Sequence, residues 1–197
     1  MKRLPCVAAV LLALGVIVSA CAGGTSSPTY FYTLSAVPAA GAAPSGSAPA
    51  RLRVAVTQVA IPGTVDRPQL VVRTGPNRVA VADFHRWAEP LREGIARALA
   101  EDLASQLGAG FEVTVGEAVG APADARVLVD VQKFEAALGG AVAVDALWAV
   151  RPLKGETRTG RGAIEERATE SDYAGVAAAY SRALARLAQD IAAALRK

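Results

Sequence analysis

The segment "ARVLVDVQKFEAALGGAVAVDALWAVR", residues 125 to 151, decides the fold of this chain. It contains two valine-rich runs of alternating character, which is typical of half-buried β-strands. The glycine pair between them, at positions 139 and 140, favours a two-residue hairpin turn. We predict an antiparallel register in which Val131 faces Trp148. That register places the large side chains on one face: Val127, Val129, Val131, Val142, Val144, Trp148 and Val150.

Trp148 admits two interpretations, a core residue or part of a ligand site, and its place on this apolar face favours the core. Further strands are expected on both sides of the hairpin. Residues 51 to 61 and 111 to 115 precede it, and residues 160 to 170 come after it with one solvated face. A second hairpin is expected around Gly75-Pro76-Asn77, because this tripeptide has strong turn chemistry.

Two amphipathic helices complete the pattern. The first begins at Glu89 or Pro90, since proline suits the first helical position, and its apolar stripe is Leu91, Ile95, Leu99, Leu103 and Leu107. The second begins near Asp172, where Thr169 or Ser171 can cap it. Its stripe is Tyr173, Ala177, Tyr180, Leu184, Leu187, Ile191 and Ala194. A helix packed on a sheet is favoured over an intermolecular coiled coil, because dedicated flanking charges are missing.

Strands that cluster before and between two helices predict an α+β fold. We expect one domain over residues 51 to 197, with a mixed or mostly antiparallel β-sheet and both long helices packed on it. The order of the strands in the sheet does not follow from the pattern.

The first 20 residues have the pattern of a secretory signal peptide. Lys2 and Arg3 precede an apolar run that is too short to span a membrane. The sequence "VSAC" at 18 to 21 resembles the bacterial lipobox, which implies that Cys21 is acylated and becomes the mature N-terminus. Cys6 would leave with the signal, so that no free thiol remains. The alternative is an ordinary signal peptide cut near Ala20.

Residues 21 to 50 differ in composition from the rest of the mature chain. The linker at 35 to 50 consists of Ala, Pro, Gly and Ser with one Val, which cannot bury enough surface to order itself. An aromatic island, "YFYTL" at 30 to 34, precedes it and has strand character. Two interpretations remain open for the island: an edge strand on the domain, or a contact with the membrane interface or a partner.

Composition argues against several function classes. The mature chain carries 19 basic and 18 acidic side chains with interspersed signs, which gives no nucleic-acid footprint. A zinc site needs three or four ligands, and His85 is the only histidine, so we predict no metal and no cofactor. A phosphate-binding loop and a nucleophile elbow are missing from the sequence. Because His85 has no evident catalytic partner, we expect a non-enzymatic protein in which it is structural or an interaction residue.

Four segments together resemble the ABC-type transport auxiliary lipoproteins, the PqiC-like group: "VSAC", "YFYTL", the block from 61 to 91, and "SDYAGVAAAYSRALARLAQDIAAAL". The most specific part is the middle block. This resemblance implies an outer-membrane lipoprotein on the periplasmic face that serves an envelope transport system. Its implied partner is an MCE-domain protein that spans the periplasm, and the implied cargo is lipid, usually phospholipid, whose movement supports membrane integrity. Ala22 after the cysteine, rather than an aspartate, agrees with the outer membrane.

The signature residues of the middle block are Asp66, Arg67, Pro68, Gln69, His85, Arg86, Trp87, Glu89 and Pro90. We expect them in two loops, with the stretch from His85 to Trp87 in the entry turn of the first helix. Our hypothesis is that the two loops lie together. They would then either lock the sheet to the first helix or contact the MCE partner, since Trp and Arg are enriched at binding hot spots.

Three functions compete on these features. The first is a docking subunit, tethered by acyl chains, that binds its partner and can also form a homo-oligomer. The rival is a carrier that binds lipid in an apolar cavity of its own, which the alanine-rich helices disfavour. A hydrolase of the envelope is a distant third, because the sequence supplies no catalytic partners.

Overall fold

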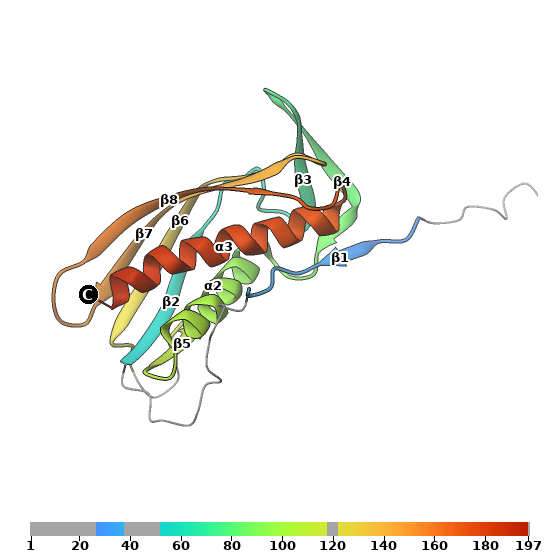
Figure 1. Cartoon of the computed structure of the whole chain (residues 1–197). Coiled ribbons are helices and arrows are strands. Elements are labelled where there is room, and N and C mark those ends of the chain that lie inside the picture. The colour runs from blue at the N-terminus through green and yellow to red at the C-terminus, as the bar shows by residue number, and fades with distance from the viewer. Residues whose placement is uncertain (1–26, 38–51, 118–121, 197) are drawn as a thin grey trace, which may run out of the picture.

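The valine-rich hairpin forms the middle of a five-stranded sheet in the computed structural model, which describes residues 27–37, 52–117 and 122–196 (Figure 1). β6 (Ala125–Ala136) pairs antiparallel with β7 (Ala141–Pro152), which pairs antiparallel with β8 (Arg158–Arg167). On the other side, β2 (Leu52–Ala60) runs parallel to β6, and β5 (Phe111–Val115) runs parallel to β2. The strand order is therefore β5-β2-β6-β7-β8.

The predicted register of this hairpin is wrong by two residues. Ala137 donates a backbone hydrogen bond to Ala141, so the turn holds three residues instead of two. A bulge beyond Val131 adds a second shift, and Val131 faces Ala146 instead of Trp148. Because the side-chain period of a strand is two, the two shifts together restore the predicted face. The valines on that face are buried, and the half-buried Trp148 packs against the same core.

A smaller sheet of three strands lies beside the first. β3 (Gln69–Gly75) and β4 (Arg78–Trp87) form the second predicted hairpin, and β1 (Tyr30–Tyr32) pairs parallel with β4. The aromatic island is thus an edge strand of the domain. The expected entry turn at His85 is wrong, because β4 continues to Trp87. Its pairing with β1 on one side and with β3 on the other uses the backbone groups that a turn would leave free.

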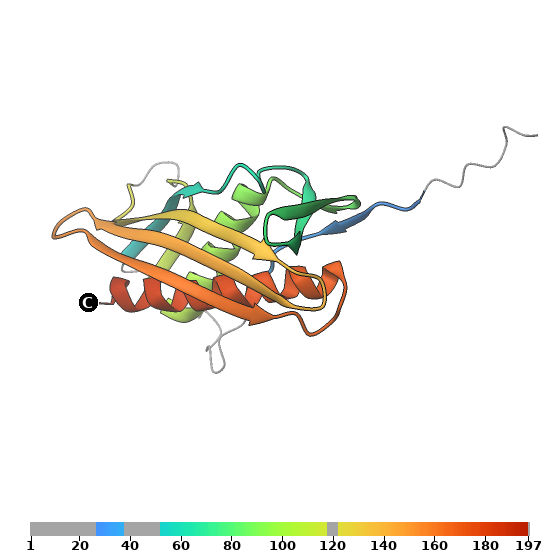
Figure 2. The same cartoon turned by 90° about the horizontal axis from the view of Figure 1, so that it is seen from above.

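The helices α2 (Leu91–Leu107) and α3 (Tyr173–Leu195) pack on the same face of the large sheet, and the other face is left without a helix (Figure 2). This arrangement confirms the α+β prediction. Pro90 precedes α2, which ends at Gly108 with a positive φ of 75°. The predicted caps of α3 are wrong, since the Oδ1 of Asp172 accepts the hydrogen bond from the Gly175 N–H at 2.8 Å. The extended backbone of Asp172 aims its carboxylate at the first turn.

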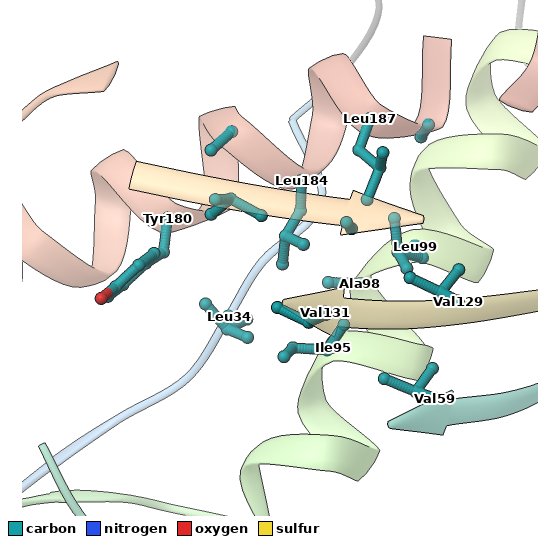
Figure 3. Packing of buried hydrophobic residues seen from close by; sticks show 14 of the residues in the cluster. Leu34, Val59, Ile95, Ala98, Leu99, Val129, Val131, Tyr180, Leu184 and Leu187 are labelled. Carbon is teal, nitrogen blue, oxygen red and sulfur yellow. The ribbon is translucent and has the colours of Figure 1, made fainter. Parts of the chain in front are cut away.

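The core lies between the two helices and the large sheet (Figure 3). Both predicted helix stripes are buried in it, apart from the half-buried Tyr173. Small residues such as Ala98 and Ala183 are fully buried as well, which allows close packing of the helices. Within the described residues, neither helix combines the length and the apolar character that a membrane span requires.

We predict that Gly160→Ala destabilises the fold. Gly160 faces Trp148 across the β7–β8 pair, and an added Cβ would overlap the indole ring, with Cε2 of Trp148 2.6 Å away. Overpacking of this kind costs about 1–3 kcal/mol of unfolding free energy. Urea denaturation followed by circular dichroism measures the loss. The matched control is Gly63→Ala, where the new methyl group meets no atom within 4 Å; equal stability of the two variants would contradict the packing described for Gly160.

Candidate functional site

A short N-terminal segment, residues 30–37, crosses the domain and is held to it along its length; we call it the strap. Its first part is β1, and the Ala88 N–H continues the pairing by donating to the Tyr32 carbonyl oxygen at 2.9 Å. Leu34 comes next, only 1% exposed, and points into the core beside Ile95 and Tyr180 (Figure 3). The strap therefore includes the first three residues of the predicted linker, which are ordered because Ser35 and Val37 bind the helices, and it is part of the hydrophobic core.

An arginine on α2 clamps the strap in place. The Nη2 of Arg97 donates to the carbonyl oxygen of Leu34 at 2.7 Å and to Oε1 of Glu89 at 2.6 Å. Its Nη1 reaches Glu101 at 3.2 Å. The hydrogen bond to Glu89, the largest cause, raises the pKa of Arg97. Glu89, a signature residue, thus orients the cation that holds the strap.

Two buried polar side chains complete the attachment. Ser181 on α3 accepts a hydrogen bond from the Ser35 N–H at 3.1 Å, and Oδ1 of Asp102 on α2 accepts one from the Val37 N–H at 2.8 Å. Asp102 is fully buried, and its Oδ2 has no hydrogen-bond partner in the described part of the chain. Burial raises the pKa of Asp102 to about 7, the charge of Glu101 adds to the rise, and the Val37 hydrogen bond opposes it.

His85 lies in a cluster of tyrosines. Its ring stacks on Tyr173 with 4.0 Å between centroids and on Tyr30 with 5.3 Å, and its Nδ1 is 2.7 Å from the hydroxyl of Tyr32. Burial, followed by the charge of Asp172, raises the pKa of Tyr32, so this hydroxyl keeps its proton. Through these contacts His85, which lies on β4, joins β1 and the start of α3 to that strand.

The two halves of the signature block lie together, as the hypothesis required. The Trp87 N–H donates to the Pro68 carbonyl oxygen at 2.7 Å, and Gln69 pairs with Arg86 across β3 and β4. They form an open groove of about 350 Å³, lined by Asp66, Arg67, Pro68, Trp87, Ala88, Glu89, Pro90 and Leu91. Asp66 is tied to Arg92 on α2 by an ion pair of 2.7 Å.

The residues of this groove divide by exposure. Trp87 is 7% exposed, and its indole lies 6.3 Å from the Tyr180 ring, so it belongs to the core. Arg67 and Arg86 are exposed and form no ion pair within residues 27–37, 52–117 and 122–196. The groove therefore combines a rigid floor with the guanidinium group of Arg67, which is available to a partner. Arg86 lies outside the lining, and its Nε donates to the Asp83 carbonyl oxygen at 3.3 Å.

The strap contacts do not follow from the sequence pattern. Arg97 lies off the apolar stripe of α2, a position that predicts a solvent-facing side chain. Asp102 is an exception, because it lies seven residues after Ile95 and three after Leu99, a spacing that predicts a carboxylate on the buried face of α2. Ser181 is a second exception, since it lies four residues after Ala177 and three before Leu184 on the predicted stripe of α3. Within the described residues, no group of three or more metal-ligating side chains comes together.

A comparison with known families matches residues 32–192 to the ABC-type transport auxiliary lipoprotein component. The matched region begins at the last residue of β1 and ends in the last turns of α3, so it contains β2 to β8, α2 and most of α3. The chain belongs to this family. An auxiliary lipoprotein is a lipid-anchored protein of the envelope that serves a transport system, and the family is not a known enzyme family.

Solved structures share the fold of this auxiliary lipoprotein. The crystal structure of an uncharacterized protein matches with a TM-score of 0.70 and 21% identity, covering 86% of this chain and 99% of that one. Protein XCC0632 from Xanthomonas campestris matches with a TM-score of 0.54 and 19% identity, covering 83% and 91% of the two chains. No curated protein matches the sequence.

We predict that Asp102→Asn flattens the pH dependence of stability. The pKa of Asp102 is about 7 in the folded protein and 3.8 in the reference state, so the folded state holds the extra proton between these values. Stability from this group is therefore greatest below about pH 4, falls as the pH rises toward 7, and is constant above. Because Asn resembles the protonated acid, the variant should not lose stability as the pH rises through this range.

Urea denaturation at pH 5 and pH 7 measures the effect. The difference in unfolding free energy between variant and parent should shift by about 2 kcal/mol in favour of the variant over this interval. Asp83→Asn is the matched control, because Asp83 is exposed and its substitution should leave the pH dependence unchanged. Parallel pH profiles for Asp102→Asn and the parent would contradict the prediction.

Proposed function

We propose that this chain is a non-enzymatic docking subunit of an MCE-type envelope transport system. Acyl chains on Cys21 hold it on the periplasmic face of the outer membrane, and the domain binds the MCE-domain protein that carries lipid between the membranes. The observation that carries the proposal is the signature groove. It exposes Arg67, without an ion pair in the described part of the chain, above a floor fixed by the buried Trp87, and the exposed Arg86 directly precedes Trp87 in β4.

The anchor is inferred from the lipobox-like sequence and from the family. Cys21 and the predicted signal peptide lie outside the described residues. Tyr30, where the strap begins, is nine positions after Cys21. A fully extended chain of that length spans at most about 30 Å, so the domain stays close to the bilayer that holds the anchor. The linker before β2 joins two parts of the same fold and adds nothing to this distance.

A series of variants separates the docking role of the signature residues from their role in the core. Arg67→Ala and Arg86→Ala should leave the folded structure intact and reduce capture of the MCE partner in crosslinked cells. Trp87→Ala should lower the unfolding free energy by about 3–5 kcal/mol, because it leaves a cavity in the core. Crosslinking, purification through the C-terminus and mass spectrometry identify what is captured.

The matched control is Arg151→Ala on β7, an exposed arginine far from the groove that forms no ion pair within the described residues. It should capture the partner as the parent does. Undiminished capture by folded Arg67→Ala and Arg86→Ala chains would contradict the docking role. Self-association of the domain into a homo-oligomer would appear in the same crosslinks as a multiple of the chain mass.

A second candidate function, the lipid carrier, is favoured by one feature of the structure. A recess of about 390 Å³ opens at the end of the large sheet beside the C-terminus of α3. Its floor includes Val54 and Val150, and Leu153 and Lys154 lie at its walls. This size and lining suit part of an acyl chain.

Native mass spectrometry tests the carrier function. If the protein is a carrier, lipid should co-purify with the parent and with the groove variants. The lipid should be lost in Val150→Trp, because the larger side chain fills the recess. Protein that purifies free of lipid and still captures its partner supports docking alone.

A further inference from the structure

One end of the molecule gathers exposed apolar side chains. Among the described residues, ten large apolar side chains are exposed, and five of them lie on β1 and β4: Tyr30, Phe31, Val79, Val81 and Phe84. Phe31 is 63% exposed and Phe84 is 46% exposed. Exposed apolar groups gathered in one region mark a surface that contacts protein or membrane.

The chain toward the anchor leaves the domain at this same end. β1 and the β3–β4 hairpin lie together at the end of the molecule opposite the C-terminus of α3 (Figures 1 and 2). Tyr30 is paired with His85, and His85 stacks on Tyr173 at the start of α3. Since α3 has 23 residues, it separates this end from its own C-terminus by about 35 Å.

From this arrangement we infer that the β1–β4 end of the domain lies in the lipid interface, with Phe31 and Phe84 among the headgroups. The inference rests on the proposed acylation of Cys21 and specifies how the anchored domain is oriented. A tether of at most about 30 Å, joined rigidly to β1, keeps this end nearest to the bilayer.

Aromatic and apolar side chains favour the boundary between headgroups and acyl chains. The charges nearby agree with a lipid surface. Arg78 and Arg86 are exposed on β4, and the exposed Asp83 is the acidic residue of the same strand. Basic side chains near anionic headgroups add attraction. Arg86 pairs with Phe31 across β1 and β4, and the next residue, Trp87, lines the partner groove, so the lipid-facing end adjoins that groove.

Depth-dependent quenching tests the orientation. The acylated full chain with Phe31→Trp is reconstituted in vesicles of phosphatidylethanolamine and phosphatidylglycerol, with and without brominated acyl chains. We expect a blue-shifted emission and a loss of emission with the brominated lipid, relative to the parent chain. The native Trp87 and Trp148 supply the background, because neither is exposed. Circular dichroism confirms that the substitution preserves the fold.

Leu153→Trp is the matched control. Leu153 is 60% exposed and lies at the recess beside the C-terminus of α3, and we expect no quenching there. Quenching of Leu153→Trp equal to that of Phe31→Trp would overturn the orientation. The orientation would also be overturned if the acylated Phe31→Trp chain floats with vesicles but shows no quenching. The same holds if that chain crosslinks to a second copy through position 31 instead. A chain that carries no acyl group and does not float would overturn the anchor, and the orientation with it.

Discussion

The burial of Leu34 between the helices and the sheet is the constraint on which the arrangement of this protein depends. It draws the strap into the core, and the Arg97, Asp102 and Ser181 hydrogen bonds then hold the backbone on both sides of it. Burying a leucine side chain stabilises by about 2 kcal/mol, and each satisfied backbone group avoids a desolvation cost. An N-terminal segment that would otherwise be a loose tether thereby becomes part of the domain.

Rigid attachment of the strap would connect the proposed anchor at Cys21 to the rest of the structure. β1 pairs with β4, β4 carries the signature residues His85, Arg86 and Trp87, and Trp87 bonds to the Pro68 loop. The segment that follows the proposed anchor is thus coupled through one sheet to the groove proposed for docking. Glu89 takes part in both the groove and the attachment of the strap, because it lines the groove and orients Arg97, which binds the strap.

The chemistry of the site agrees with a binding role. The imidazole of His85 is stacked among tyrosines, and the groove presents the guanidinium group of Arg67 beside an apolar floor. Such a surface recognises acidic or polar partners by charge and shape, and a buried tryptophan keeps it rigid. The open face of the large sheet and the recess beside the C-terminus of α3 share no lining residue with the groove, so they are separate surfaces.

The sequence by itself determined the elements and the faces they bury. Periodicity of 2 and 3.6 residues marked the strands and both helix stripes, because each pattern depends only on near neighbours along the chain. Tertiary structure alone decided the hairpin register, the continuation of β4 through His85, and the clamps on the strap. A bulge is one extra residue with no sequence signature in β6, and the Arg97–Leu34 and Asp102–Val37 contacts join residues 63 and 65 positions apart. Such contacts form only when the whole core has brought their partners together.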